Sequence, residues 1–148
     1  MIYVDGQRQT KQYLTTINPD DIYNTLIFRS DYNVKLFAKL FPEIKDPAGA
    51  LIIVTEPNKD KPATIAFTKQ VIRLATHLSF GASLGMMKLV SQALPDARYY
   101  LDSLLVTQRE AAHAKGLKGM IVLKGPPAAD YAHDLAAATT GVIQLETK

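Results

Sequence analysis

The sequence contains no cysteine, which excludes disulfide bonds and thiolate metal sites. It has no apolar run of 18 or more residues, and it opens without the charged and apolar segments of an export leader. It also has no basic run, because 17 Lys and Arg against 14 Asp and Glu give a net charge of +3 that is spread along the chain. We therefore expect no nucleic-acid partner and no membrane-spanning segment.

What is present is the composition of a globular protein, with 148 residues of which 47% are hydrophobic and 21% charged. That length suffices for one compact domain or two very small ones. Asn18 and Pro19 predict a single turn of helix. Strands are predicted at residues 2–4, 25–28, 50–54, 99–101, 120–123 and 142–145, and helices at residues 34–41, 108–114 and 126–138. Between these, residues 63–67 fit a strand, residues 71–78 fit a helix, and two glycines interrupt the pattern before residues 86–94.

Two parts of the chain repeat the same order of elements. Tyr3-Val4-Asp5 matches Tyr100-Leu101-Asp102, Leu26-Ile27-Phe28-Arg29 matches Ile121-Val122-Leu123-Lys124, and Gly49-Ala50-Leu51 with Thr55 matches Gly141-Val142-Ile143 with Thr147. Each copy reads as strand, turn, short helix, strand, helix, glycine and strand. The repeat predicts an α/β fold, with α+β as the alternative: two related β-α-β units at residues 1–57 and 98–148, a mixed sheet, and an interposed, partly helical segment at residues 58–97.

The matched segments resemble the plug domain of TonB-dependent outer-membrane receptors, in particular of SusC-type transporters and of the plug-like tails of some membrane sensor peptidases. That family has the pattern YVIDG, then NPxDIESIEVLKG, an alanine-rich helix ending in YG, and a terminal GVIxITTK. Residues 2–6, 18–22, 26–30 and 49–56 follow it in the first copy, and residues 99–102, 117–125, 126–131 and 141–148 in the second. The first copy lacks the alanine-rich helix, and the second has His113-Ala114-Lys115-Gly116-Leu117 where the first has the NPDDI segment.

The resemblance implies a periplasm-facing module that responds to other proteins. We therefore expect a non-enzymatic docking or gating module of a larger bacterial envelope protein, in the periplasm or at the periplasmic face of the outer membrane. Its expected partner is another envelope protein, and no cofactor is expected. A small mixed sheet with exposed edges can accept a further strand, which leaves both a monomer and a strand-swapped homodimer open.

A small serine hydrolase is the alternative function. The segment Gly81-Ala82-Ser83-Leu84-Gly85 has the G-x-S-x-G form in which glycines allow a sharp turn that exposes a nucleophilic serine. Asp130 and His133 are the downstream acid and base that a triad with Ser83 would need. They lie three residues apart on one predicted helix, which favours a surface pair, so we interpret the segment as a structural glycine turn.

No metal site is predicted. The three histidines do not have the spacing of metal ligands; they are His77, His113 and His133. Asp20 and Asp21 lie in the first turn of a predicted helix, where the helix dipole accounts for them. Asp5 and Asp102 occupy equivalent turns in the two copies, so turn formation accounts for these carboxylates as well.

Overall fold

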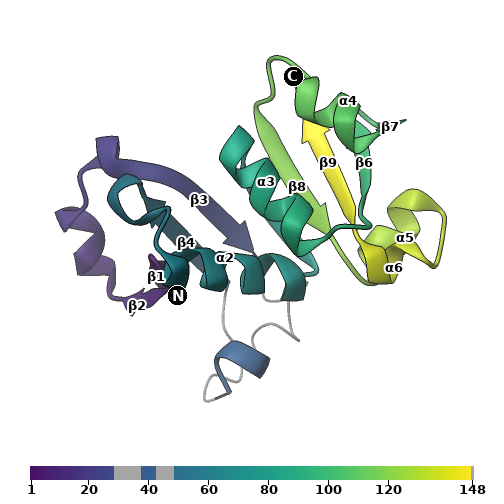
Figure 1. Cartoon of the computed structure of the whole chain (residues 1–148). Coiled ribbons are helices and arrows are strands. Elements are labelled where there is room, and N and C mark those ends of the chain that lie inside the picture. The colour runs from purple at the N-terminus through teal and green to yellow at the C-terminus, as the bar shows by residue number, and fades with distance from the viewer. Residues whose placement is uncertain (29–37, 43–48, 148) are drawn as a thin grey trace.

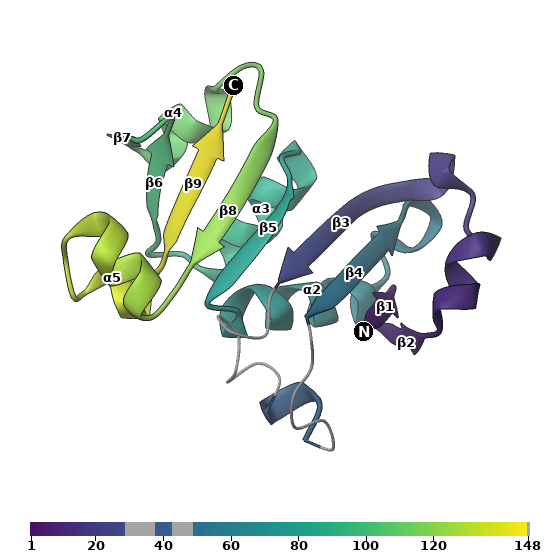
Figure 2. The same cartoon turned by 180° about the vertical axis from the view of Figure 1, so that it is seen from behind.

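The computed structural model describes residues 1–28, 38–42 and 49–147 (Figure 1). The strands of these residues form one mixed sheet of nine strands, and helices lie on both of its faces (Figures 1 and 2). The predicted α/β class is therefore confirmed, and the two repeated units share one sheet. Of the helix predicted at residues 34–41, residues 34–37 lie outside the described residues, and residues 38–40 are helical.

The N-terminal unit contains short strands and 3-10 helices, which are labelled η. Its elements are β1 (Ile2–Val4), β2 (Gln7–Gln9), η1 (Lys11–Thr16), η2 (Pro19–Asp21), β3 (Ile22–Phe28), β4 (Ala50–Thr55) and η3 (Glu56–Asn58). Asp5 and Gly6 join β1 to β2 and have φ angles of 50° and 84°, as a two-residue hairpin of type I′ requires. The Asn18 side chain accepts a hydrogen bond from the Asp20 N–H at 3.1 Å, so the predicted helical turn is confirmed, as a 3-10 turn.

The central segment contains α2 (Pro62–Leu74), β5 (His77–Gly81) and α3 (Leu84–Ala93). The strand predicted at residues 63–67 is wrong because these residues lie inside α2. The helix predicted at residues 71–78 is wrong in its second half, where the chain has already entered β5. Pro62 occupies the first turn of α2, where its missing N–H costs no helical hydrogen bond. The buried residues of α2 lie on one helical face: Thr64, Thr68, Val71 and Ile72.

The C-terminal unit repeats the strand order of the first. Its elements are β6 (Arg98–Leu101), β7 (Leu104–Val106), α4 (Gln108–His113), β8 (Gly119–Leu123), α5 (Pro126–Ala132), α6 (Ala137–Thr140) and β9 (Val142–Glu146). It has the helix α4 where the first unit has η1 and η2. The predicted strands and α4 are confirmed. The single helix predicted at residues 126–138 is wrong, because His133 adopts a left-handed conformation with φ 51° and ψ 39° that ends α5.

Strand pairing is the same in both units. The sheet order is β2-β1-β4-β3-β5-β8-β9-β6-β7. In each unit the first strand pairs antiparallel with the second and parallel with the last, and the last pairs antiparallel with the third. Leu26 pairs with Ile52, and its counterpart Ile121 pairs with Gln144. The residue matches of the sequence repeat therefore hold in the strand register.

β5 lies between the units and pairs antiparallel with both β3 and β8. The strands on the two sides of β5 follow each other in mirrored order, and β3 and β8 run in the same direction. A rotation by half a turn about the axis of β5 therefore relates the two units. A strand superposes on itself after a half-turn and a rise of one residue, because its side chains alternate. The registers show this one-residue step: Leu26 pairs with Phe80, whereas its counterpart Ile121 pairs with Ser79. β5 can therefore pair on its two sides with two equivalent strand edges, those of β3 and β8.

The half-turn places equivalent side chains on opposite faces of the sheet. The Tyr3 ring packs in the main core, with its centroid 4.9 Å from that of Phe41 and 5.5 Å from that of Phe67. Its counterpart Tyr100 packs on the other face, 5.0 Å from the Tyr131 ring of α5. The repeated unit is thus the same in pairing and different in the helices that cover it.

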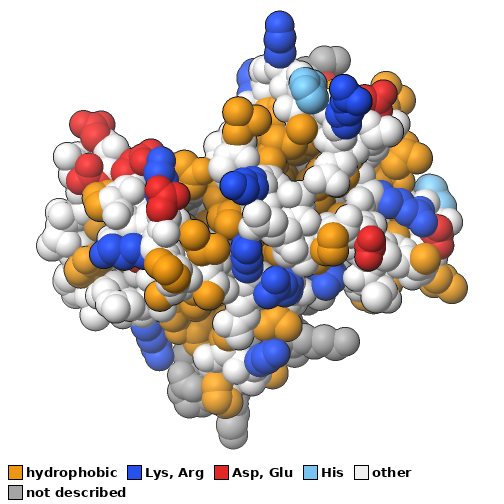
Figure 3. All heavy atoms as spheres, in the orientation of Figure 1, with side chains coloured by type: hydrophobic (Ala, Val, Ile, Leu, Met, Phe, Trp, Pro, Cys, Tyr) orange, Lys and Arg blue, Asp and Glu red, His pale blue; other side chains and the backbone are white. Residues whose placement is uncertain are grey.

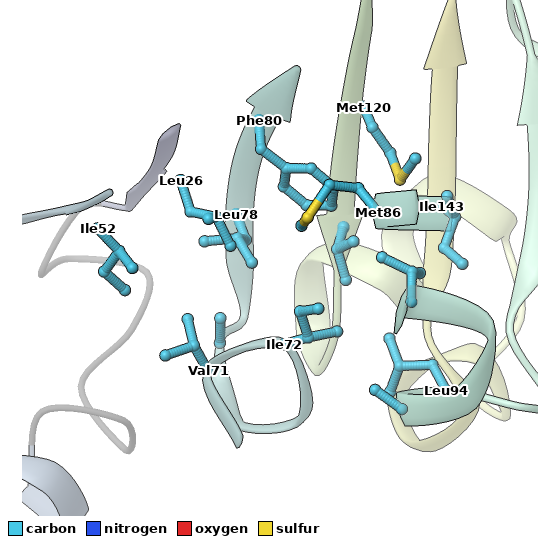
Figure 4. Packing of buried hydrophobic residues seen from close by; sticks show 14 of the residues in the cluster. Leu26, Ile52, Val71, Ile72, Leu78, Phe80, Met86, Leu94, Met120 and Ile143 are labelled. Carbon is cyan, nitrogen blue, oxygen red and sulfur yellow. The ribbon is translucent and has the colours of Figure 1, made fainter. Parts of the chain in front are cut away.

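The main core lies between the sheet and α2, α3 and α4, and Figure 4 shows its central part. Leu78 of β5, Met86 of α3 and Ile143 of β9 are fully buried there. Burial of each such side chain stabilises the fold by about 1.5–3 kcal/mol. Both units and the central segment contribute to this one cluster, so their helices and strands are held by shared packing.

Candidate docking surface

Ser83 lies between β5 and α3, at the strand-to-helix junction that the G-x-S-x-G pattern predicts. Its backbone is extended, with φ −146° and ψ 158°, and lacks the strain of a nucleophile elbow. The Ser83 Oγ accepts a hydrogen bond from the Met86 N–H at 3.2 Å and lies 3.2 Å from the Tyr23 hydroxyl oxygen. This serine is the N-cap of α3.

Asp130 and His133 lie elsewhere in the fold. Asp130 is an exposed residue of α5, and His133 is the residue that ends this helix. α5 packs on the face of the sheet opposite to α3, as comparison of Figures 1 and 2 shows. The structure therefore does not bring these two residues to Ser83, and neither is placed to activate its hydroxyl.

The carboxylates of the two equivalent turns are both used to fix those turns. The Asp5 carboxylate accepts hydrogen bonds from the Thr55 N–H at 2.8 Å and from the Thr55 hydroxyl at 2.7 Å. The Asp102 carboxylate accepts from the N–H of Thr147 at 2.9 Å and also from its hydroxyl. Each aspartate thus ties a hairpin turn to the end of the parallel neighbouring strand, which accounts for its position in the repeat.

The remaining polar candidates do not gather into a site. Asp20 and Asp21 lie in η2, within one helical turn and exposed. His77 is in β5, whereas His113 ends α4. Within residues 1–28, 38–42 and 49–147, no group of three or more His, Cys, Asp or Glu is placed to hold a metal ion. No helix in the same ranges combines the length and the apolar character that crossing a bilayer requires.

The clearest unexplained feature is a surface with exposed leucines beside α3, α4 and β7. Leu84 is 75% exposed, Leu104 71% and Leu105 66%. Hydrophobic side chains are visible at the surface between α3 and α4 (Figure 3). Two hollows indent this surface, and we call the three leucines with these hollows the α3–β7 surface. Exposed apolar side chains that are grouped favour association with another surface, whereas isolated ones are common.

The two hollows share their floor. The smaller has a volume of about 220 Å³ and is lined by Leu84 and Met87 among others, and the larger has about 440 Å³ and is lined by Leu105 and Arg98 among others. Tyr99 and Gln108 line both. Tyr99 is only 4% exposed, and burial raises the pKa of its hydroxyl above the usual value. Its ring is therefore uncharged at neutral pH, and it lies at the base of both hollows.

Arg98 fixes one wall of the larger hollow. Its guanidinium pairs with the Asp134 carboxylate, which also accepts a hydrogen bond from the Ala136 N–H at 2.9 Å. The bond to Arg98 and the backbone bond hold the pKa of Asp134 below its usual value. The pair links β6 to the segment between α5 and α6, so this wall is held by an interaction across the unit.

β7 adds an open sheet edge to the surface. Asp102 and Ser103 have φ angles of 45° and 71° and form a second two-residue hairpin turn. Leu101 and Leu104 flank this turn as its hydrogen-bonded pair, so the next pair, Tyr100 and Leu105, is not hydrogen-bonded. The N–H and C=O of Leu105 consequently point away from β6. An exposed leucine on an unpaired edge is a template for association with another chain.

Comparison with protein-family models, characterised proteins and solved structures gave no match.

Sequence patterns missed β7 and the surface that it borders. The run of residues 104–106 is only three residues long, too short for alternation to indicate a strand. Asp102-Ser103 occupies the same place in the repeat as Asp5-Gly6, so a second hairpin was the signal that could have revealed β7. Exposure of the leucines depends on the packing of α3 and α4, which no local pattern reports.

Proposed function

We propose that the chain is a non-enzymatic docking module of a larger bacterial envelope protein, acting in the periplasm or at the periplasmic face of the outer membrane. It binds another envelope protein through the α3–β7 surface. The observation that carries this proposal is the exposure of three leucines beside two adjoining hollows and an open sheet edge: Leu84 lines the smaller hollow, Leu105 lines the larger, and Leu104 precedes Leu105 on β7. The residue-level repeat of strand pairing supports the plug-like part of the proposal.

The energetic argument rests on the exposed leucines. Burial of a leucine side chain is worth about 1.5–3 kcal/mol, before the costs of association are subtracted. Leu104 and Leu105 are successive residues of an edge strand, so their side chains point to opposite faces of the sheet, and a partner strand that adds to the β7 edge can contact both. The hydroxyl of Ser83 is engaged in capping α3, which favours docking over the hydrolase alternative.

The test is recovery of partners from periplasmic and outer-membrane extracts, with three forms of the protein compared. These are the wild type, the double variant Leu104→Ser and Leu105→Ser, and the control Leu135→Ser. Leu135 is 87% exposed and lies outside the α3–β7 surface, between α5 and α6. Circular dichroism and thermal unfolding establish that each variant is folded.

We expect the wild type and the Leu135 variant to recover the same protein, and the double variant to lose it. Equal recovery by all three folded forms contradicts binding through this surface, and recovery of nothing by the wild type contradicts docking. Sedimentation velocity of the purified chain identifies the case in which the partner is a second copy. Ester hydrolysis by the wild type that Ser83→Asn abolishes would favour the enzyme instead, because asparagine retains capping and removes the nucleophile.

A further inference from the structure

A separate hollow of about 310 Å³ lies between α2 and α3. One wall is the face of α2 that carries Ile65 and Lys69, which are four residues apart. The other wall is a face of α3, lined by Gly85, Lys88, Leu89 and Gln92. Residues preceding α2 and the start of β3 close one end. We call this hollow the α2–α3 groove, and its lining combines the apolar side chains of Ile65 and Leu89 with a lysine on each helix.

The end of the groove is held in place by the start of β3. The hydroxyl of Tyr23 is hydrogen-bonded to the Ser83 hydroxyl, which itself caps α3. A Cβ at position 85 would overlap the Tyr23 hydroxyl oxygen, so only glycine leaves room for this arrangement. The Lys59 ammonium lies 4.8 Å from the centroid of the Tyr23 ring, at cation–π distance. The Tyr23–Ser83 hydrogen bond and the cation–π contact thus fix α3, β3 and Lys59 relative to one another.

The charge of the groove is mainly positive. Lys59 pairs with Glu56 at 2.8 Å, and this hydrogen bond raises the pKa of Lys59, which stays protonated. Among the described residues, neither Lys69 nor Lys88 has an ion-pair partner, and Asp60 is the one acidic residue lining the groove. Lys and Arg side chains gather over α2 and α3 on this face (Figure 3).

We propose that the α2–α3 groove binds an acidic segment of a partner protein. Carboxylates of the segment pair with Lys69 and Lys88, and an apolar side chain between them contacts Ile65 and Leu89. Charge complementarity identifies the occupant, because the ammonium groups of Lys69 and Lys88, which have no ion-pair partner among the described residues, line the same groove as two apolar side chains. The inference rests on the proposed docking function and extends it. Lys88 also lines the smaller hollow of the α3–β7 surface, so one partner can contact both sides of α3.

The experiment is an amide NMR titration of the whole chain with a synthetic peptide of repeating Leu-Glu-Glu sequence. Its matched peptide has glutamine at every glutamate, and inorganic phosphate at equal ionic strength is the third probe. The variants are the double substitution Lys69→Gln and Lys88→Gln, and the control Lys115→Gln and Lys118→Gln. The control lysines are exposed residues between α4 and β8, outside the groove.

The acidic peptide should shift the amide signals of groove residues such as Ile65, Gly85 and Leu89. The Lys69 and Lys88 variant should bind about two- to thirtyfold more weakly, as expected for two exposed ion pairs, and added NaCl should weaken wild-type binding. The control variant should bind as the wild type does. Equal binding of the glutamine peptide, absence of shifts in the groove, or equal weakening in the control variant overturns the inference.

Phosphate that produces the same shifts and displaces the peptide also overturns the assignment, because the groove would then bind small anions in general. This outcome is distinguishable from failure of the docking function. The docking function is tested by partner recovery with the Leu104 and Leu105 variant, in which the groove is intact. The groove is tested by peptide binding to a chain in which both leucines are present.

Discussion

The two hairpin turns differ at one residue, and this difference predicts a stability change. Gly6 and Ser103 are the second turn residues, with φ angles of 84° and 71°. For a residue with a Cβ, the left-handed conformation is about 1–2 kcal/mol less favourable than the right-handed one. Ser103→Gly removes that strain. The substitution also lowers the free energy of unfolding by about 0.4–1 kcal/mol, because glycine gives the unfolded chain more conformational freedom. The net expectation is stabilisation by about 0.5–1 kcal/mol, or about 1–4 °C in Tm.

The reciprocal substitution tests the same reasoning with the opposite sign. Gly6→Ser introduces the strain, and a Cβ there would lie 3.3 Å from both the Cβ and the Cγ of Phe67. We expect destabilisation by about 1–2 kcal/mol. Gly116→Ser is the control, since Gly116 has φ 73° and a Cβ there would have nothing within 4 Å, so this variant reports strain without crowding.

The assay is thermal and urea unfolding followed by circular dichroism, with all variants at one protein concentration. Stabilisation by Ser103→Gly together with destabilisation by Gly6→Ser supports the equivalence of the two turns. An unchanged or lower stability of the Ser103 variant, with an intact native spectrum, refutes the argument that this serine is strained. A Gly116 variant as destabilised as the Gly6 variant would show that Phe67 contributes nothing to the cost.

Two further predictions concern the ion pair and the cap. Because the folded-state pKa of Asp134 is lowered, its pairing with Arg98 stabilises the fold at neutral pH and this contribution is lost as the pH falls through that lowered pKa. Asp134→Asn should therefore be less stable than the wild type at pH 7, with a difference that shrinks below about pH 4 in urea unfolding; a difference independent of pH contradicts the assignment. Ser83→Ala should destabilise by about 1 kcal/mol, because the Met86 N–H loses its cap, and Ser83→Asn should restore most of this; equal stability of the two variants argues against capping.

The repeat was predictable because it depends on side-chain spacing that local strand geometry preserves. The match of Leu26 with Ile121 along the chain predicts the register that both β-pairings show. The central segment was not predictable in the same way, since the β-branched side chains of Thr64 and Ile65 favour a strand locally, whereas in the fold they lie in a helix that packs on the core. Pro62, at a position suited to a helix start, was the local signal that favoured the helix.

The candidate site could be predicted only in part. The junction at Ser83 followed from the glycine pattern, and the structure places it between a strand and a helix as that pattern requires. Its role depended on Tyr23 and Met86, and Tyr23 lies 60 residues away in the sequence. The α2–α3 groove likewise joins lysines of two helices whose contact is set by tertiary packing, and neither lysine stands in a recognisable motif.

The position of β5 decides where a partner strand can be accepted. Each repeated unit has an inner edge, at β3 or β8, and β5 occupies both through its two equivalent sides. In the described part of the chain, the edges that stay unpaired are those of β2 and β7. β2 carries Gln7, Arg8 and Gln9, and polar or charged residues on an edge discourage pairing with other chains. β7 carries Leu104 and Leu105, which are exposed and uncharged. The two units are alike in pairing and unlike at this edge, so the proposed docking is expected at the C-terminal unit.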